Sequence, residues 1–184
     1  MKLNKYCIVV TGLPASGKST MGIEVAKLLD IPYFDKDDYL ENLFTKRGVG
    51  NPDWRQSLSR EADVEFREDS IAENEVVLIS HWRPKGLNVQ FGTPTEWISD
   101  HFEKVIELYC DCPVELAATR FRSRVRHEGH VDESRSIGEV INWLKGYEKY
   151  LPMNLGQKVV IDSTESIGIQ IAKDKITAVI RSNA

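Results

Sequence analysis

Nine residues near the start of the chain combine the side chains and glycines that hold phosphate. The run Gly12-Leu13-Pro14-Ala15-Ser16-Gly17-Lys18-Ser19-Thr20 fits the P-loop pattern G-x-x-x-x-G-K-[ST]. Its glycines let backbone N–H groups approach a phosphate chain, and its lysine places an ammonium on the β- and γ-phosphates. Its serine hydroxyl can ligate Mg²⁺. We therefore predict a nucleotide-binding site, with the lysine also catalytic, formed by Gly12, Ala15, Ser16, Gly17, Lys18, Ser19 and Thr20.

A cluster of carboxylates follows the second apolar segment, Ile31 to Phe34. Asp35 and Asp37 lie one residue apart there, so both would reach the P-loop if the first two strands flank it. Mg²⁺ prefers oxygen ligands, and a hydroxyl that attacks a γ-phosphate needs a group that orients or deprotonates it. The two carboxylates fit these needs. The alternative is that Asp37 and Asp38 merely cap a helix that begins near Tyr39, with Asp38 the better candidate for the cap.

Arginines are concentrated between residues 120 and 126. Phosphoryl transfer places negative charge on the equatorial oxygens, and mobile arginines commonly neutralise it. Arg120 and Arg124 are four residues apart and share a face of the expected helix, so we predict that they act on the nucleotide phosphates. Arg122 and Arg126 form a second such pair. The alternative is a solvated basic helix face.

The segment after the third apolar run, Ser80-His81-Trp82-Arg83-Pro84, lies where an acceptor would meet the P-loop. It contains no aspartate, which leaves open whether Ser80 or Asp35 completes a magnesium shell. Arg55, His81 and Arg83 are candidates for holding an acidic acceptor. Trp54, Trp82 and Trp97 are candidates for the wall of a ring-binding pocket or for ordinary core packing.

Apolar periodicity predicts strands and helices that alternate along the chain. The expected strands span residues 6–11, 31–34, 76–79, 104–110 and 159–162, and the expected helices follow the P-loop and cover 39–47, 54–74, 94–101, 113–126, 137–151 and a last segment capped by Ser166. This alternation predicts an α/β fold with a parallel sheet and helices on both faces. Ligands of such sheets bind at the carboxyl ends of the strands. We expect one domain, residues 1–184, with a lid at about 120–136.

Composition narrows the class of protein further. The chain has 184 residues, of which 41% are hydrophobic, and a formal net charge of −4. An acidic balance makes nucleic acid an unlikely partner and argues against a membrane-surface role. The N-terminus is too short and polar for a signal peptide, and Cys7, Cys110 and Cys112 form no disulfide framework, so we expect a cytoplasmic protein. Its oligomeric state is left open.

The carboxylate stretch carries a family resemblance. Tyr33-Phe34-Asp35-Lys36-Asp37-Asp38-Tyr39-Leu40-Glu41 resembles the F-x-D-x-D-x-x-I-E stretch of shikimate and gluconate kinases, and also chloramphenicol phosphotransferase and polynucleotide-kinase-like proteins. The resemblance implies a three-layer P-loop NTPase fold with a five-stranded parallel sheet. It also implies ATP and Mg²⁺ as cofactors. By position it assigns Asp35 to Mg²⁺ and Asp37 to the acceptor hydroxyl. The R-x-x-x-R spacing of Arg120 and Arg124 resembles the lids that close over ATP in P-loop kinases.

These features favour an ATP-dependent phosphotransferase that acts on a hydroxyl of a small molecule. No N-K-x-D guanine signature is present, and the third strand ends in Ser80 and not in an Asp-Glu pair like that of motor ATPases. We expect adenine to be read mostly by the backbone near Asp162 to Thr164, so ATP is the default donor over GTP. Two alternatives stay open: a nucleotide-binding regulatory ATPase module, and a polynucleotide 5′-hydroxyl kinase.

Overall fold

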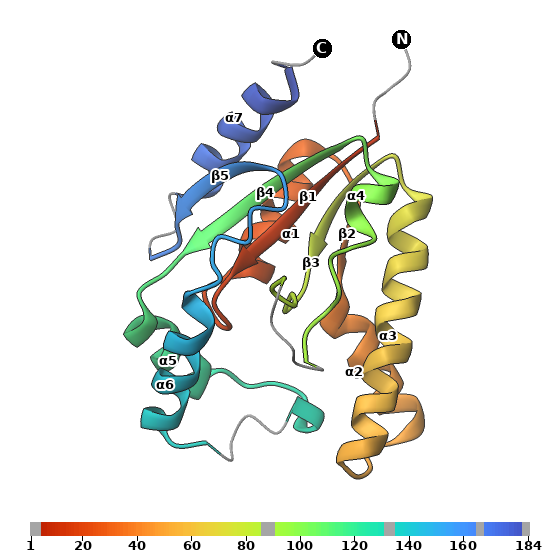
Figure 1. The fold of residues 1–184 in the computed structure, drawn as a ribbon, viewed down its shortest axis with the longest axis vertical. Helices are drawn as coiled ribbons and strands as arrows, with labels where there is room; N and C mark the ends of the chain where they lie inside the picture. The colour runs from red at the N-terminus through yellow and green to blue at the C-terminus, as the bar shows by residue number, and fades with distance from the viewer. Residues whose placement is uncertain (1–4, 86–90, 131–134, 165–167, 182–184) are drawn as a thin grey trace.

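A computed structural model describes residues 5–85, 91–130, 135–164 and 168–181 (Figure 1). Its five strands form one parallel sheet in the order β2-β3-β1-β4-β5. The elements are β1 (Tyr6–Gly12), α1 (Lys18–Leu29), β2 (Tyr33–Asp35), α2 (Lys36–Arg47), α3 (Pro52–Ala72), β3 (Glu75–Ile79), α4 (Ile98–His101), β4 (Lys104–Asp111), α5 (Val114–Ser123), the 3₁₀ turn η1 (Glu128–His130), α6 (Ile137–Glu148), β5 (Gln157–Asp162) and α7 (Gly168–Arg181). The predicted fold class is confirmed.

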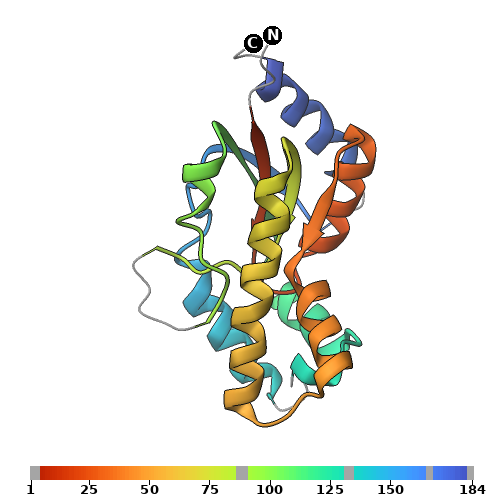
Figure 2. The same cartoon turned by 90° about the vertical axis from the view of Figure 1, so that its right-hand side faces the viewer.

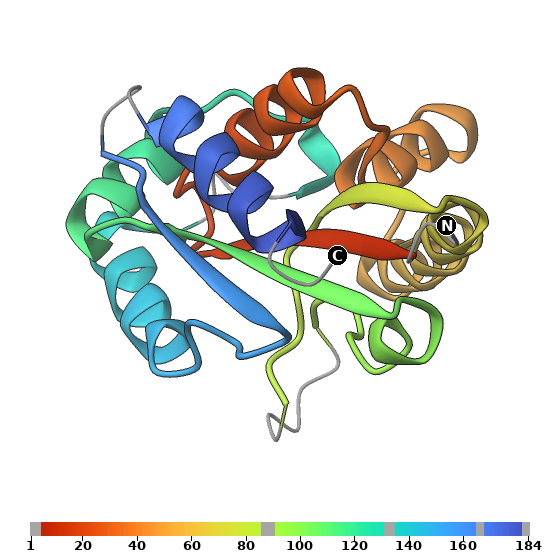
Figure 3. The ribbon, with the colours of Figure 1, turned by 90° about the horizontal axis from the view of Figure 1, so that it is seen from above.

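Helices cover both faces of the sheet (Figure 3). Alternate residues of β1 point to opposite faces, and both sets are apolar because each face is covered. Val10 packs with Val25 of α1 and Ile176 of α7, and all three are fully buried. On the other face, Val9 packs with Phe66 of α3 and with the short helix α4. The sheet is therefore the middle layer of three, and only its strand ends are open to a ligand.

Two helical pairs extend beyond the carboxyl ends of the strands (Figures 1 and 2). Helices α2 and α3 pack through a cluster that includes Leu43 and Leu58. Helices α5 and α6 pack through another, in which Phe121 and Leu144 meet Leu13 of the P-loop. The two pairs lie on either side of the P-loop, so they form the side walls of the space in which a ligand would bind.

A buried carboxylate fixes the connection between α6 and β5. Glu107 of β4 is completely buried and accepts hydrogen bonds from the Thr11 hydroxyl (2.8 Å) and from the backbone N–H groups of Met153 (2.7 Å) and Leu155 (3.0 Å). A buried charge is tolerated when its oxygens are satisfied in this way. The contact ties the segment after α6 to the strand that carries the P-loop.

Several predicted boundaries are wrong for local reasons. Helix α2 begins at Lys36 and not near Tyr39, because the Asp35 side chain accepts from the Asp37 backbone N–H (3.1 Å) and caps the helix. Asp35, and not Asp38, is therefore the cap. The helix expected from Pro94 begins only at Ile98, since residues 94 and 95 are irregular and residues 96 and 97 form a turn.

Other differences concern the strand order and the chain after α5. Strand β3 lies between β1 and β2, so the first two strands are not neighbours. Helix α5 ends at Ser123, and Arg124 has an extended backbone. Helix α6 ends at Glu148 and not at Leu151. The predicted cap Ser166 lies outside the described residues. Within the described ranges, no helix is both long enough and apolar enough to cross a membrane.

Candidate functional site

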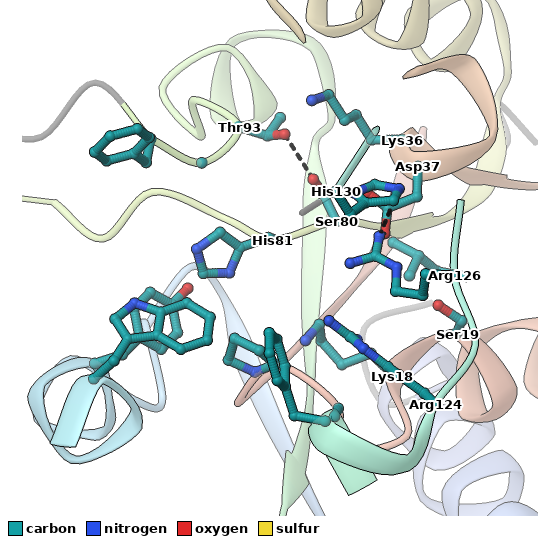
Figure 4. Close-up of a pocket in the computed structure, with 18 of the residues that line it drawn as sticks. Lys18, Ser19, Lys36, Asp37, Ser80, His81, Thr93, Arg124, Arg126 and His130 are labelled. Carbon is teal, nitrogen blue, oxygen red and sulfur yellow. Dashed lines mark hydrogen bonds and ion pairs between the residues drawn. The ribbon is translucent and has the colours of Figure 1, made fainter. Parts of the chain in front are cut away.

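A large cavity opens at the carboxyl ends of the strands, between the α2/α3 and α5/α6 pairs (Figure 4). Its volume is about 1110 Å³, which exceeds the usual 300–1000 Å³ of a small-ligand site and leaves space for two ligands. The residues that line it include Ala15, Gly17, Lys18, Ser19, Thr20, Asp35, Lys36, Asp37, Ser59, Ser80, His81, Phe91, Thr93, Arg120, Phe121, Arg124, Arg126, His130, Arg135, Asn142, Trp143, Gly146, Tyr147 and Tyr150.

The P-loop has a backbone that only particular residues adopt easily. Gly17 precedes α1 with a φ of 96°, and Ala15 has a φ of 62°, both in the left-handed region. Gly12 has a φ of 141°, and a Cβ there would lie 2.6 Å from the Cys110 carbonyl oxygen of β4. The first glycine is thus needed for contact with the neighbouring strand, and the second for the turn into α1.

Lys18 is held within the loop. Its ammonium donates to the carbonyl oxygens of Gly12 (3.2 Å) and Leu13 (2.9 Å). Burial lowers the pKa of Lys18 to about 8, so anionic phosphates that approach it would restore its preference for the charged form. The N-terminus of α1 points at the same space and favours an anion there.

Ser19 and Asp35 form a pair of oxygen donors beside the P-loop. The Ser19 hydroxyl donates to a carboxylate oxygen of Asp35 at 2.6 Å, and both residues line the cavity. Burial and the neighbouring charge of Asp37 raise the pKa of Asp35 to about 6. A hydroxyl and a carboxylate are hard oxygen ligands, and a cation between them would favour the ionised carboxylate. This donor set fits Mg²⁺.

Asp37 lies in the same cavity and is paired with an arginine. The Arg126 guanidinium donates to its carboxylate (Figure 4). Burial acts to raise the pKa of Asp37, but the surrounding positive charges, Arg126 foremost, outweigh it and lower that pKa. Arg126 also meets His130, which contacts Glu41 of α2 at 2.9 Å. The segment that contains Arg126 is therefore docked on α2.

The arginines predicted to act on phosphates occupy different positions. Arg120 stays in α5 and donates to the backbone carbonyls of Ser163 (3.1 Å) and Thr164 (3.3 Å), beyond β5. Arg124 lies outside the helix, with its guanidinium 4.3 Å from the Phe121 ring centroid. Both line the cavity, as Arg126 does, whereas Arg122 is exposed and is not part of the lining. The two predicted arginines thus do not share a helix face.

The expected acceptor residues are brought together only in part. His81 lines the cavity, and burial lowers its pKa to about 4, so it is neutral at pH 7. Arg83 and Arg55 do not line the cavity; they donate to the backbone carbonyls of Gly92 (3.1 Å) and Gly50 (2.9 Å). The geometry therefore does not support the prediction that Arg55 and Arg83 bind an acidic acceptor.

The tryptophans named from the sequence do not form the pocket wall. Trp82 is 1% exposed and donates to the Val10 carbonyl at 2.8 Å, within the core beneath the sheet end. Trp97 is partly buried in the same cluster. Trp54 is exposed and donates to the Gly48 carbonyl at 3.2 Å. The indole that lines the cavity is Trp143 of α6, which the sequence analysis did not single out.

A chain of hydrogen bonds connects Ser80 to a carboxylate. The segment that follows β3 in the sequence contains no carboxylate of its own at this point. The Thr93 hydroxyl donates to Asp63 of α3 at 2.8 Å and lies 2.6 Å from the Ser80 hydroxyl (Figure 4). A hydroxyl has one proton to donate, so Ser80 donates to Thr93 when Asp63 is ionised. Ser80 then faces the cavity as a hydrogen-bond acceptor. Lys36 approaches the same carboxylate at 3.8 Å.

This chain gave no signal in the sequence. Asp63 lies in the middle of a long charged helix, thirty positions from Thr93, and only the packing of α3 against the sheet edge joins them. Lys36 was visible within the predicted carboxylate stretch, and its near-complete burial marks it as part of the site. Burial lowers the pKa of Lys36, while Asp63 opposes that effect.

The fold and the site together define a P-loop nucleotide-binding protein with a kinase-like fold. The sequence matches the family described as "AAA domain" over residues 8–141, and the chain belongs to this family. Shikimate kinase 1, chloroplastic, from Oryza sativa subsp. japonica is 28% identical over 123 residues, which are 64% of this chain and 36% of that protein. The chain thus matches little more than a third of its curated relative.

Solved structures share the architecture. A structure from Chloroflexus aurantiacus j-10-fl superposes with a TM-score of 0.74 at 18% identity and covers 100% of both chains. Shikimate kinase from Bacteroides thetaiotaomicron superposes with a TM-score of 0.63 at 21% identity, over 95% of this chain and 98% of that one. These likenesses confirm the three-layer P-loop fold.

Proposed function

We propose that the protein transfers the γ-phosphate of ATP to a hydroxyl of a small-molecule acceptor. The observation that carries this proposal is the position of Asp37, whose carboxylate lines the same cavity as the P-loop and the Ser19–Asp35 pair. A nucleotide-binding protein that only senses ATP needs no second carboxylate there. The relatives named as shikimate kinases, one of them sharing 28% identity, support the same reaction class.

Each residue has a part in the reaction. Lys18 and the P-loop backbone hold the β- and γ-phosphates. Ser19 and Asp35 would hold Mg²⁺, which would neutralise phosphate charge. The acceptor oxygen attacks the γ-phosphorus, the bond to the β–γ bridging oxygen breaks and ADP leaves. Asp37 orients the acceptor hydroxyl and takes its proton.

The Asp37–Arg126 pair couples nucleotide binding to this step. Arg126 is paired with this carboxylate. When Arg126 turns to the γ-phosphate together with Arg120 or Arg124, the pKa of Asp37 rises and the carboxylate becomes a better proton acceptor. The segment from about 120 to 136, of which residues 131–134 lie outside the described residues, would then act as the lid that excludes water and limits hydrolysis of ATP.

The test is a screen of metabolite pools with ATP labelled at its γ-phosphate. We expect one acceptor class to gain label with the parent protein and none with Lys18→Ala, because loss of the ammonium removes the main phosphate contact. Equal transfer by Lys18→Ala would contradict the proposal. ATP binding with no labelled acceptor in any pool would favour the regulatory module, and labelled RNA or DNA ends would favour the polynucleotide kinase.

A further inference from the structure

One face of α6 forms the wall of the cavity opposite α2 and α3 (Figures 1 and 4). The α6 residues that line the cavity, together with Tyr150 just after the helix, are Asn142, Trp143, Gly146, Tyr147 and Tyr150. They recur at spacings of one, three and four residues, which places them on one side of the helix. Three of the five are aromatic, and a glycine lies between them.

Gly146 is not explained by the packing of the helix. A Cβ at this position would meet no atom within 4 Å, and the backbone there is ordinary helix. Glycine inside a helix is destabilising relative to alanine, so it is usually kept where a neighbour or a turn requires it. Neither is present here. Gly146 is exposed and lines the cavity, so its Cα borders open space on that side.

The aromatic wall continues from α6 to the end of β3. The Tyr147 hydroxyl donates to the Trp82 carbonyl at 2.6 Å, which fixes the ring. The imidazole of His81 lies 4.9 Å from the Tyr147 ring centroid and 6.1 Å from that of Trp143. Arg135 lies over Trp143, with its guanidinium carbon 4.7 Å from the ring centroid. The wall is therefore held in place before any ligand binds.

The rings of this wall carry no charge, but one cation, Arg135, lies over Trp143. His81 is neutral at pH 7, and the arginines expected to hold a carboxylate, Arg55 and Arg83, do not line the cavity. A slot with aromatic sides and an open floor binds flat rings through their faces. The Asn142 amide offers a donor and an acceptor at the same wall.

We propose that the slot over Gly146, bounded by Trp143, Tyr147 and Tyr150, receives a planar aromatic ring of the acceptor. The phosphorylated hydroxyl is carried on an arm of that ring which reaches Asp37. The inference rests on the proposed function, since it names the class of molecule that the same site phosphorylates. Its test nevertheless measures binding without turnover.

The test uses saturation-transfer NMR with three probes, in protein saturated with Mg²⁺ and a non-hydrolysable ATP analogue so that the adenine site is filled. The probes are benzyl alcohol, which has a planar ring, cyclohexylmethanol, which has a puckered ring of equal size, and gluconate, which is acidic and has no ring. We expect the signal of benzyl alcohol to exceed that of the other two at least fivefold.

Gly146→Ala is the decisive variant, and Gly138→Ala is its matched control. Gly138 is on the same helix and also has open space at its Cβ, but it does not line the cavity. We expect the melting temperature of each variant to equal that of the parent or to exceed it by up to about 3 °C. We expect Gly146→Ala to reduce the benzyl alcohol signal at least fivefold and Gly138→Ala to leave it unchanged. Trp143→Ala should reduce it as well.

Two results would overturn the slot. One is an unchanged benzyl alcohol signal in Gly146→Ala; the other is gluconate binding that exceeds benzyl alcohol binding in the parent. A labelled acceptor without a planar ring in the metabolite screen would likewise remove the slot while leaving the kinase function in place. Conversely, ring binding in a protein that transfers no phosphate would remove the kinase function and leave the slot.

Discussion

The two ends of the cavity are built in opposite ways. The phosphate end comes from consecutive residues, Gly12 to Thr20, and its donors are largely backbone groups whose direction is set by a strand, a turn and a helix. The acceptor end is assembled from side chains on β3, α2, α3 and α6 and from the segment around Thr93. Backbone groups present much the same surface in any chain with this loop, whereas side chains can be exchanged one at a time.

This difference indicates which end of the cavity determines specificity for the acceptor. A P-loop identifies a phosphate chain and nothing of the molecule that receives the phosphate. Three carboxyl groups connect the two ends: Asp35 on the metal side, Asp37 at the centre and Asp63 behind Ser80. If this division is correct, substitutions at these carboxylates should separate nucleotide binding from phosphate transfer.

The largest separation is expected at Asp37. Asp37→Asn should reduce phosphate transfer by about 10²- to 10³-fold, because an amide cannot take the acceptor's proton. ATP affinity, measured by calorimetry, should change less than about threefold, since the residue does not belong to the P-loop. Transfer is measured as ADP release with an acceptor that the metabolite screen has identified.

Asp38→Asn is the control for that variant. Asp38 is on the same turn of α2, but its side chain is exposed and does not line the cavity. We expect parental transfer rates from it. If both variants transfer phosphate at the parental rate, Asp37 is a structural residue, and the acceptor end is not organised around it.

A smaller effect is expected for Asp35, and it appears in stability. Burial raises its pKa to about 6 from the ordinary 3.8, so the folded apo protein holds this proton more tightly than the unfolded chain does. The resulting stabilisation is complete below pH 3.8 and is lost as the pH rises through 6, by about 2–3 kcal/mol. Asp35→Asn lacks this titration.

Urea unfolding of the parent and Asp35→Asn between pH 4 and 8 measures the effect. We expect the free energy of unfolding of the parent, relative to that of the variant, to fall with rising pH and to level off above pH 7. Added Mg²⁺ and ATP should stabilise the parent more than the variant, because the ionised carboxylate is the form that binds the cation. A pH-independent difference would show that Asp35 is ionised in the apo protein.

Much of the fold was predictable from the sequence, because it depends on local patterns. Apolar runs alternate with helical spacing from Tyr6 to the last helix, and this alternation implies a parallel sheet. The order of the strands was not predictable in the same way. The carboxylates were expected to reach the P-loop if the first two strands flank it. Strand β3 lies between β1 and β2, yet Asp35 still reaches Ser19, because the carboxyl ends of all parallel strands lie at one edge.

The acceptor end was the harder part to predict. Arg55 and Arg83 have the chemistry to bind an acid, but each side chain is satisfied by a nearby backbone carbonyl. The aromatic residues of α6 were readable as a periodic set, although periodicity alone cannot tell a cavity wall from a core. Gly146 was the available signal, as an isolated glycine between aromatic residues in a predicted helix.

The smallest separation of phosphate transfer from nucleotide binding is expected at Thr93, which joins Asp63 to Ser80. Thr93→Val keeps the shape of the side chain but removes the hydroxyl, and the backbone hydrogen bonds of Thr93 with His81 and Arg83, both 2.8 Å, stay in place. Ser80 is then free to turn its proton toward the cavity and no longer presents a fixed acceptor. We expect kcat to fall about tenfold, equivalent to about 1.4 kcal/mol, with ATP affinity unchanged.

Thr93→Ser keeps the hydroxyl but lacks the methyl group, and it should retain most of the parental rate. If the methyl group had a purely steric role, this variant would lose rate as well. The valine also leaves the Asp63 carboxylate short of a donor, so a lower melting temperature is expected and must be measured alongside. Ser80→Ala and the double variant complete the cycle. If the chain acts as one unit, the double variant loses no more than either single variant; additive losses would mean that Thr93 and Ser80 act separately, and that Asp63 has no part in orienting the acceptor end.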